Sequence, residues 1–282
     1  MTSEGWSDAT EAWFEGAGGT RLFYRHARPA GGARALLVSL HGLGDHSGLY
    51  PMLPDALLPR GIEIVAPDLR GNGRSPGQRG YVEAWRQLRD DLGHLIQTTR
   101  AERPELPLFL LGSSLGGLLV LDYALHNSEG IRGVVAVAPP LGRLGVPAPL
   151  LALGRVLSRV WPRFSLETGM DLSGLARDPE VAARVLRDPL FHRRGTARLS
   201  TEVTATIARL QAAAPRFPVP VLVLHGSADR MVPPDGSRRF MSGVGHPDKR
   251  LVEYPGGYHA LLADVDGERV LADIAEWLTA RA

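Results

Sequence analysis

This chain of 282 residues has a serine between two glycines at the junction of two apolar runs, and this pattern narrows its possible folds more than any other. Residues 108–111 form the first run, residues 117–120 begin the second, and Gly112-x-Ser114-x-Gly116 stands between them. This pattern is typical of a sharp turn from a buried strand into a buried helix, with the serine at its tip. Glycines flank the tip because a Cβ there would clash with the adjoining strand and helix. The turn predicts a nucleophilic Ser114 whose hydroxyl stands clear of the sheet.

Two backbone N–H groups are candidates for stabilising the oxyanion that forms when Ser114 attacks a carbonyl. The turn itself directs the N–H of Leu115 toward the atom under attack. Residues 35–40 form a continuous apolar run, the mark of a buried strand, and lead into a His-Gly-x-Gly sequence. Such a loop typically supplies the second donor, and the natural candidate is the N–H of Leu43.

A serine hydroxyl is a weak nucleophile near neutral pH and needs a base, which in turn needs an orienting acid. After a turn of this kind the expected chain order is serine, then an acid, then histidine. The sequence offers Ser114, Asp229 and His259, each in a loop that directly follows a predicted strand. Asp235 is a rival acid that lies deeper in the following helix, and His246 is a rival base that precedes the last strand. We therefore expect Ser114 as nucleophile, His259 as base and Asp229 as the orienting carboxylate.

The rest of the apolar pattern alternates between strands and helices, which indicates an α/β protein with a mostly parallel central sheet and helices on both faces. Residues 13–14 and 21–26 look like an antiparallel hairpin at the sheet edge. Further strands are predicted over residues 62–66, 133–138, 219–224 and 250–254, and helices over residues 50–58, 81–102, 235–243 and 268–280.

Residues 141–218 break this alternation. They contain no β-rich run, and helical spacing over residues 148–160, 179–186 and 196–214 predicts a helical cap inserted into the core. The core would then comprise residues 1–140 and 219–282. Arg155 and Arg159 stand four apart on the first helix, so it could touch an anionic lipid interface. The favoured interpretation, which is compatible with such a contact, is a lid helix with its apolar face on the core and solvated arginines outside.

The composition narrows the class of protein. No cysteine is present, which excludes disulfides and thiolate metal sites. His41 and His46 could bind a metal, but no carboxylate pattern at ligand spacing accompanies them, so we expect no metal and no cofactor. The arginines are spread along the chain among acidic residues, which argues against a nucleic-acid partner.

The sequence also bears on location. Residues 1–10 have neither the basic start nor the apolar centre of a signal peptide. Residues 107–125 are apolar enough to suggest a membrane span, but the glycine-serine turn inside them favours a buried strand and helix. We expect a cytoplasmic protein, with peripheral contact at membranes left open.

These motifs resemble the α/β-hydrolase superfamily and, within it, the monoacylglycerol lipase and lysophospholipase-like group of serine hydrolases. The resemblance covers nearly the whole chain, and the segments that carry it are residues 41–50, 67–75, 112–117, 225–229 and 257–259, with Asp188-Pro189-Leu190 in the cap. It implies an α/β-hydrolase fold, hydrolysis of a long- or medium-chain acyl ester, and a cap that forms an apolar acyl tunnel. The group usually has His and Met on either side of the nucleophile, where this chain has Ser113 and Leu115.

The leading hypothesis is a cofactor-free serine hydrolase that cleaves esters of single-chain lipids such as monoacylglycerols, through an acyl-enzyme on Ser114. The alternatives are a broad carboxylesterase for short or synthetic esters, a peptidase, and a catalytically silent binding protein. The silent protein is disfavoured because all three triad positions are filled. A deep apolar cavity with a small polar end above Ser114 would favour monoacylglycerols, and a shallow cleft the broad esterase.

Overall fold

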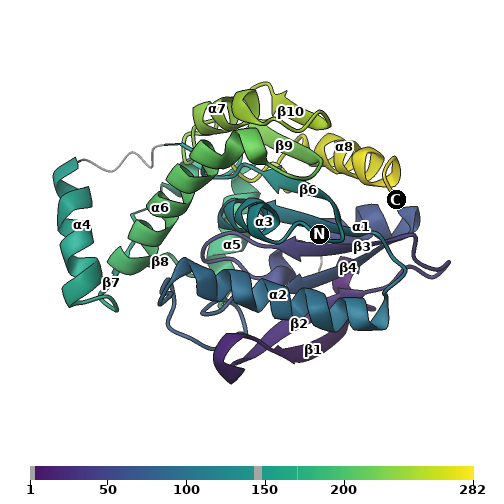
Figure 1. Cartoon of the computed structure of the whole chain (residues 1–282), viewed down its shortest axis with the longest axis horizontal. Coiled ribbons are helices and arrows are strands. Elements are labelled where there is room, and N and C mark those ends of the chain that lie inside the picture. The colour runs from purple at the N-terminus through teal and green to yellow at the C-terminus, as the bar shows by residue number, and fades with distance from the viewer. Residues whose placement is uncertain (1–3, 143–147, 170) are drawn as a thin grey trace.

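An eight-stranded sheet forms the centre of the computed structural model, which describes residues 4–142, 148–169 and 171–282 (Figure 1). The strand order is β1-β2-β4-β3-β5-β6-β9-β10. β2 pairs antiparallel with β1 and β4, and the pairs from β4 to β10 are parallel. This confirms the predicted mostly parallel sheet. The strands are β1 (Thr10–Glu15), β2 (Arg21–Ala27), β3 (Ala35–Leu40), β4 (Ile62–Pro67), β5 (Leu108–Ser113), β6 (Ile131–Val137), β9 (Val221–Gly226) and β10 (Lys249–Tyr254).

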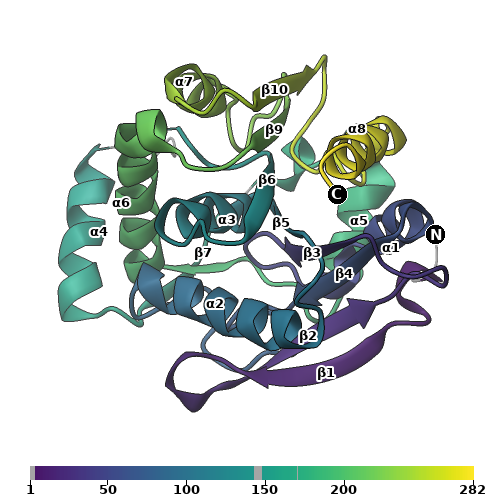
Figure 2. The same ribbon diagram turned by 45° about the vertical axis from the view of Figure 1, so that its right-hand side comes forward.

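The sheet is covered on both faces, because successive side chains of each strand enter two different apolar layers. In β5, Leu108 and Leu110 belong to one layer, and Phe109 and Leu111 belong to the other. Helices line both layers (Figure 2). The first layer contains α2 (Trp85–Glu102), α3 (Leu115–His126) and α7 (Asp235–Gly243), and the second contains α1 (Met52–Leu57) and α8 (Gly267–Thr279).

Between β6 and β9 the chain leaves the sheet, and we call residues 141–218 the inserted segment. It contains α4 (Ala148–Val160), α5 (Pro179–Arg187) and α6 (Ala197–Ala213), close to the helices predicted there. It also contains β7 (Ser165–Glu167) and β8 (Arg194–Thr196), which pair antiparallel. The expectation of no strand here was wrong, since strands of three residues are too short to give an alternating pattern. Residues 143–147 and 170 of the predicted cap lie outside the described residues.

Helix α4 is the outlying element of the inserted segment. It packs on α6, and Figure 1 shows it at the margin of the molecule, beyond α6 from the sheet. Ser158 of α4 hydrogen-bonds Thr201 of α6 at 2.9 Å between the two hydroxyl oxygens. Among the described residues, no helix combines the length and apolar character needed to cross a bilayer.

Helix α2 begins at Trp85, four residues later than its apolar spacing predicts. The preceding backbone lies against the inserted segment: the hydroxyl of Thr196 donates to the carbonyl of Gly80 at 2.8 Å. The carboxylate of Glu202 on α6 then accepts from the Trp85 N–H at 2.7 Å. This contact satisfies a first-turn N–H that has no partner within its own helix. The start of α2 is therefore fixed by a tertiary contact.

Asp122 of α3 joins three helices. Its carboxylate is fully buried and accepts from the indole N–H of Trp85 at 3.0 Å and from Arg89 of α2 at 3.1 Å. Arg209 of α6 donates to its other oxygen at 3.2 Å. A buried carboxylate is tolerated only with such partners, because an unpaired one is strongly disfavoured.

Replacing Asp122 should therefore unfold the protein more readily. Asp122→Ala leaves three donors without their acceptor, and we expect the free energy of unfolding to fall by about 3 kcal/mol. Asp122→Asn keeps the shape and one acceptor oxygen, so its stability should lie in between. Urea unfolding followed by circular dichroism measures the difference. Asp235→Ala removes an exposed carboxylate and should change stability by less than about 0.5 kcal/mol. Equal stabilities of the two alanine variants would show that the Asp122 carboxylate does not stabilise the contact between the three helices.

Candidate active site

Ser114 stands at the turn from β5 into α3, in a backbone conformation that only glycine adopts easily. Its φ is 51° and its ψ is −117°. The glycines around it allow the close crossing of strand and helix. A Cβ on Gly112 would lie 2.2 Å from the carbonyl oxygen of Gly116, and one on Gly116 would lie 2.5 Å from that of Leu40. Holding a serine in this conformation costs on the order of 1–3 kcal/mol, which the surrounding packing supplies.

The structure brings Ser114, Asp229 and His259 together. The Nε2 atom of His259 lies 3.0 Å from the Ser114 hydroxyl oxygen, and its Nδ1 lies 2.7 Å from an oxygen of Asp229. Because the ionised carboxylate only accepts hydrogen bonds, Nδ1 carries the proton and Nε2 is free to accept from the serine. The three residues come from the turns after β5, β9 and β10, which meet at the carboxyl edge of the sheet.

Asp229 is held as a buried, ionised carboxylate. Burial alone would raise its pKa, but hydrogen bonds from His225, His259 and the Val232 N–H outweigh this effect and hold the pKa well below its usual range. The N–H groups of Met231 and Val232 donate to the same oxygen at 2.9 and 2.8 Å. Asp229 can therefore fix the orientation of His259 across the neutral pH range.

His225 supports this carboxylate through its side chain, a role that the sequence analysis did not identify. Its Nε2 donates to the carbonyl of Val232 at 2.8 Å and lies 3.4 Å from Asp229, and its Nδ1 accepts from the hydroxyl of Ser237 at 2.9 Å. The imidazole is buried at the end of β9. Its place between a strand end and an acidic loop residue was the only signal in the sequence.

The rival residues lie in other surroundings. Asp235 is exposed on α7 and pairs with Arg238 at 2.8 Å. His246 accepts from the backbone N–H of Asp248 at 3.1 Å, ahead of β10. His41 is buried with both ring nitrogens engaged: Nδ1 donates to the Gly42 carbonyl at 2.7 Å, and Nε2 accepts from the Leu69 N–H at 2.9 Å. Burial lowers the pKa of His41, which keeps the ring neutral.

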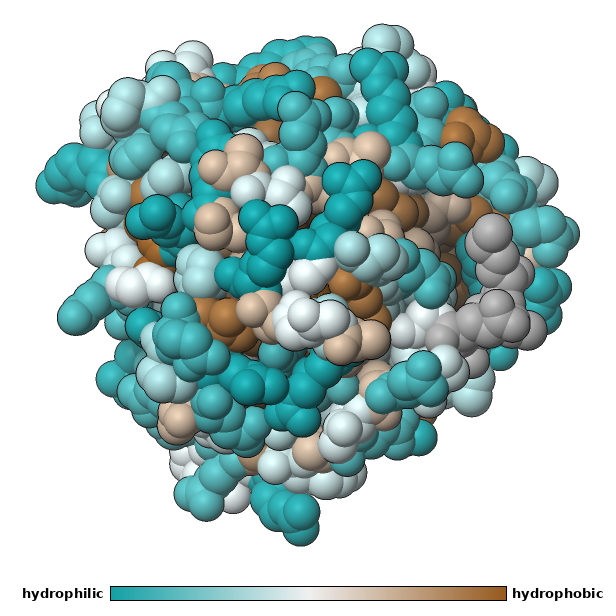
Figure 3. All heavy atoms as spheres, turned by 90° about the vertical axis from the view of Figure 1, so that its right-hand side faces the viewer, coloured by the Kyte–Doolittle hydropathy of each residue, from teal (hydrophilic) through white to brown (hydrophobic). Residues whose placement is uncertain are grey.

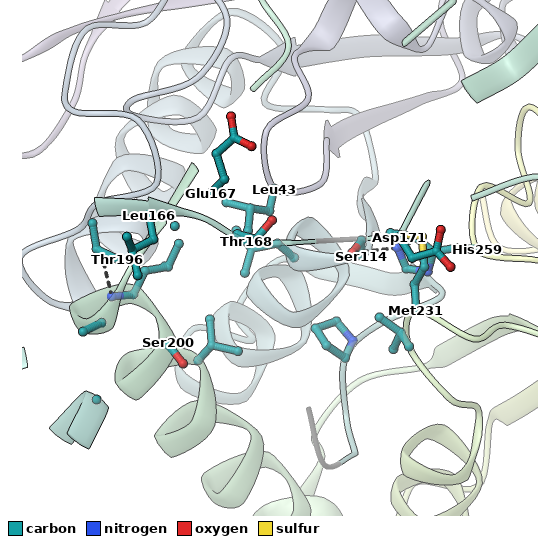
Figure 4. Close-up of a pocket in the computed structure, with 18 of the residues that line it drawn as sticks. Leu43, Ser114, Leu166, Glu167, Thr168, Asp171, Thr196, Ser200, Met231 and His259 are labelled. Carbon is teal, nitrogen blue, oxygen red and sulfur yellow. Dashed lines mark hydrogen bonds between the residues drawn. The ribbon is translucent and has the colours of Figure 1, made fainter. Parts of the chain in front are cut away.

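A large apolar cavity opens above Ser114. Its volume is about 650 Å³, and it lies between the sheet edge and the inserted segment. Figure 4 shows Ser114 and His259 together at one end of the cavity, and Leu166 and Thr196 toward the other. Most of its wall is apolar, with contributions from Leu43, Leu115, Leu157, Phe164, Leu199, Val203 and Met231. Both predicted oxyanion residues, Leu43 and Leu115, thus line the same cavity as Ser114.

A second, smaller cavity of about 100 Å³ also reaches Ser114 and His259. Asp45, Tyr50 and Ser113 give it a polar region, while Leu175, Val181 and Phe191 of the inserted segment are among its apolar lining. The Tyr50 hydroxyl donates to the Asp45 carboxylate at 2.7 Å and accepts from the Gly42 N–H at 3.4 Å. Burial and the Asp45 charge raise the pKa of Tyr50 well above its ordinary value, so it stays a hydrogen-bond donor.

Fold and site together define an α/β-hydrolase with a serine at the nucleophile turn. Comparison with known proteins gives the family: residues 31–266 match the family described as Serine aminopeptidase, S33, and the chain belongs to it. The protein is a monoacylglycerol lipase-like member of this fold and a carboxylic ester hydrolase, which confirms the predicted resemblance.

Several relatives carry lipase names. The chain is 31% identical to the monoacylglycerol lipase of Mycolicibacterium smegmatis, over 96% of this chain and 98% of that protein. It is 32% identical to the human monoglyceride lipase, over 94% and 89% of the two chains. Among solved structures, the monoacylglycerol lipase of Paleococcus ferrophilus superposes with a TM-score of 0.85 at 36% identity, covering 93% of this chain and 99% of that one.

The backbone strain at Ser114 should lower the free energy of unfolding of the wild type. Ser114→Gly relieves the unfavourable backbone conformation, and after the entropic cost of glycine we expect the free energy of unfolding to rise by about 1 kcal/mol. Ser113→Gly is the matched control, because Ser113 is an extended residue of β5 and should lose about 0.5–1 kcal/mol. Guanidinium unfolding of both variants measures the difference. If Ser114→Gly lowers the free energy of unfolding as much as Ser113→Gly does, the backbone of Ser114 is not strained.

Proposed function

We propose that the protein hydrolyses esters of single-chain lipids, with monoacylglycerols as its substrate class. The observation that carries this proposal is the pair of cavities that meet at Ser114. The larger one has the apolar wall that a fatty acyl chain requires, and the smaller one has the hydrogen-bonding groups that a polyol requires. The lipase names of relatives that match almost the full length of the chain support the same class.

In this proposal the acyl chain occupies the large cavity and the glycerol lies in the small one. The carboxylate of Asp45 offers an acceptor to glycerol hydroxyls, and the Tyr50 hydroxyl holds that carboxylate in place. A substrate that lacks the hydroxyl would leave the buried polar groups of such a site unpaired, and this disfavours it more than the loss of one methylene contact does. The small cavity would therefore select for the alcohol, and the large cavity for an acyl chain.

The proposed reaction proceeds in two acyl transfers. Ser114 attacks the ester carbonyl while Nε2 of His259 takes the hydroxyl proton, and Asp229 stabilises the resulting imidazolium. The N–H groups of Leu43 and Leu115 stabilise the oxyanion, each worth about 10²–10³ in rate by analogy with measured donors. His259 returns the proton to the departing glycerol oxygen. Water then attacks the acyl-enzyme with His259 as its base, which releases the fatty acid and regenerates Ser114.

We further propose that α4 contacts the lipid aggregate from which the substrate comes. Leu153, Val156 and Val160 follow one another at helical spacing and are exposed, as is the adjacent Trp161. Leu153 also lines the large cavity, so this apolar stripe continues into it. By contrast, the face on the far side of the molecule from α4 is predominantly hydrophilic, with scattered apolar side chains (Figure 3). Peripheral membrane contact would follow from the same stripe.

A substrate panel tests the proposed function. We expect monoacylglycerols with medium or long chains to be hydrolysed with a higher kcat/KM than p-nitrophenyl acetate, because only they fill both cavities. Preference for the acetate would favour the broad carboxylesterase, and preference for an aminoacyl amide would favour a peptidase. A fluorophosphonate probe should label the wild type but not Ser114→Ala. Absence of labelling on the wild type would support a binding protein.

The role of Asp229 can be tested against its sequence rival. Asp229→Asn removes the charge that fixes the His259 tautomer, and kcat should fall by about 10³–10⁴. Asp235→Asn alters an exposed carboxylate more remote from this network and should leave kcat within twofold, a small effect typical of surface sites. Steady-state hydrolysis of one monoacylglycerol by both variants gives the comparison. Comparable losses would remove Asp229 from the mechanism.

The α4 contact predicts a substrate-dependent defect. Val156→Asp should lower the rate on monoacylglycerol in vesicles by about tenfold, since burying a charge in the interface is unfavourable by at least 1.4 kcal/mol. Hydrolysis of monomeric p-nitrophenyl acetate should be unchanged. Val265→Asp places the same charge on an exposed valine in the turn before α8 and is the control. If both variants lose vesicle activity equally, α4 has no special contact with lipid.

A further inference from the structure

Three successive peptide groups of the loop that contains Leu43 are each held by a hydrogen bond from outside the loop's own backbone. The carbonyl of Gly42 belongs to the same peptide group as the Leu43 N–H, and it accepts from the His41 ring at 2.7 Å. The Gly44 N–H, one peptide further, donates to the side chain of Asn72 at 3.2 Å. The Gly44 carbonyl, one further still, accepts from the His192 N–H at 3.1 Å.

The last of these contacts comes from the inserted segment, and it is close. Gly44 has a φ of +82°, and a Cβ there would lie 1.9 Å from the carbonyl oxygen of His192. Only glycine lets the two backbones approach in this way. Gly44, the residue after Leu43, is therefore in direct backbone contact with His192 of the inserted segment.

The side chains of Asn72 and His192 complete a closed network. The side-chain oxygen of Asn72 accepts from both the Gly44 N–H and the His192 Nε2–H, the latter at 2.9 Å. The Asn72 amide nitrogen donates to the Arg70 carbonyl at 3.0 Å, which fixes the amide orientation. On the other side of the ring, His192 Nδ1 accepts from the Arg194 N–H at 3.2 Å. Each polar atom of the two side chains has a partner of the correct kind.

This arrangement requires a neutral imidazole, because Nδ1 accepts and Nε2 donates. Burial, reinforced by the charge of Arg79, lowers the pKa of His192 to about 4. The ring therefore stays neutral over the range in which serine hydrolysis operates. Asn72 is 6% exposed, so it cannot readily exchange these partners for water.

We propose that His192 is a positioning residue for the oxyanion hole, and that with Asn72 it locks the Leu43 peptide in place from the inserted segment. The proposal rests on the proposed function, in which Leu43 supplies one of the two oxyanion donors. Its consequence is that the inserted segment contributes to the chemical step as well as to the walls of the cavities. These hydrogen bonds should matter little for the affinity of the ground-state substrate, because only the tetrahedral intermediate has an oxyanion for the Leu43 N–H to stabilise.

The test separates misplacement of the donor from loss of fold. Active sites of wild type, His192→Ala and Asn72→Ala are first counted by stoichiometric fluorophosphonate labelling, and kcat is expressed per labelled site. We expect kcat per site to fall by about 10- to 100-fold in both variants, less than the 10²–10³ for outright loss of a donor. KM should stay within twofold. Affinity for a trifluoromethyl ketone, which forms an oxyanion on Ser114, should fall in parallel with kcat.

Two further variants keep the inference testable if alanine disturbs folding. His192→Gln can still donate to Asn72 and should recover at least half of the wild-type kcat per site. The double variant His192→Ala/Asn72→Ala should be no worse than Asn72→Ala alone, because the two residues act through one network. Arg187→Ala, an exposed residue of α5 that pairs with Glu180, is the control and should match the wild type.

The outcomes distinguish the two proposals. A wild type without Ser114-dependent hydrolysis would overturn the proposed function. An active wild type whose kcat per site is unchanged in both alanine variants, or in which KM changes instead of kcat, would overturn the positioning role. Additive effects in the double variant would also overturn it, since they would place the two residues in independent interactions.

Discussion

The unfavourable backbone conformation of Ser114 determines how closely β5 and α3 must cross. A side chain at φ 51° needs a strand and a helix that cross closely enough to hold it, and Gly112 and Gly116 make that crossing possible. β5 and α3 in turn need a sheet and helices that bury them on both sides. The energy stored at one residue is thus supplied by the apolar layers of the whole core.

The charge of the catalytic acid is stabilised by groups that the fold brings to it. Asp229 is buried and yet ionised, because backbone and imidazole donors replace the water that it loses. His259 thereby receives a carboxylate partner on one side and a neutral hydroxyl on the other. Two mainly apolar cavities meet at this point, and the smaller one also carries the polar groups of Asp45, Tyr50 and Ser113.

The inserted segment is attached to the core unevenly. Its residues 175–178 and 192–196 form hydrogen bonds with the loops that carry His259, Leu43 and Gly80. Arg177, for example, donates to the buried Asp264, five residues after His259. Helix α4 instead packs on α6, with Ser158 as its polar contact. One part of the segment is therefore tied to the loops of the site, whereas α4, for which we propose the contact with lipid, is attached through α6.

The amino-acid sequence alone was enough to predict that Ser114, Asp229 and His259 each follow a strand and meet, because apolar periodicity and glycine spacing are local properties of the chain. Strand β3 and helix α7 have the predicted bounds. The remaining features depend on contacts between segments that are distant in the sequence. The Trp85 N–H at the start of α2 donates to Glu202, the Asp229 carboxylate lies beside His225, and Gly44, next to Leu43, hydrogen-bonds Asn72 and His192. No local pattern records these partners, since hydrogen-bond geometry arises only once the sheet has brought its loops to one edge.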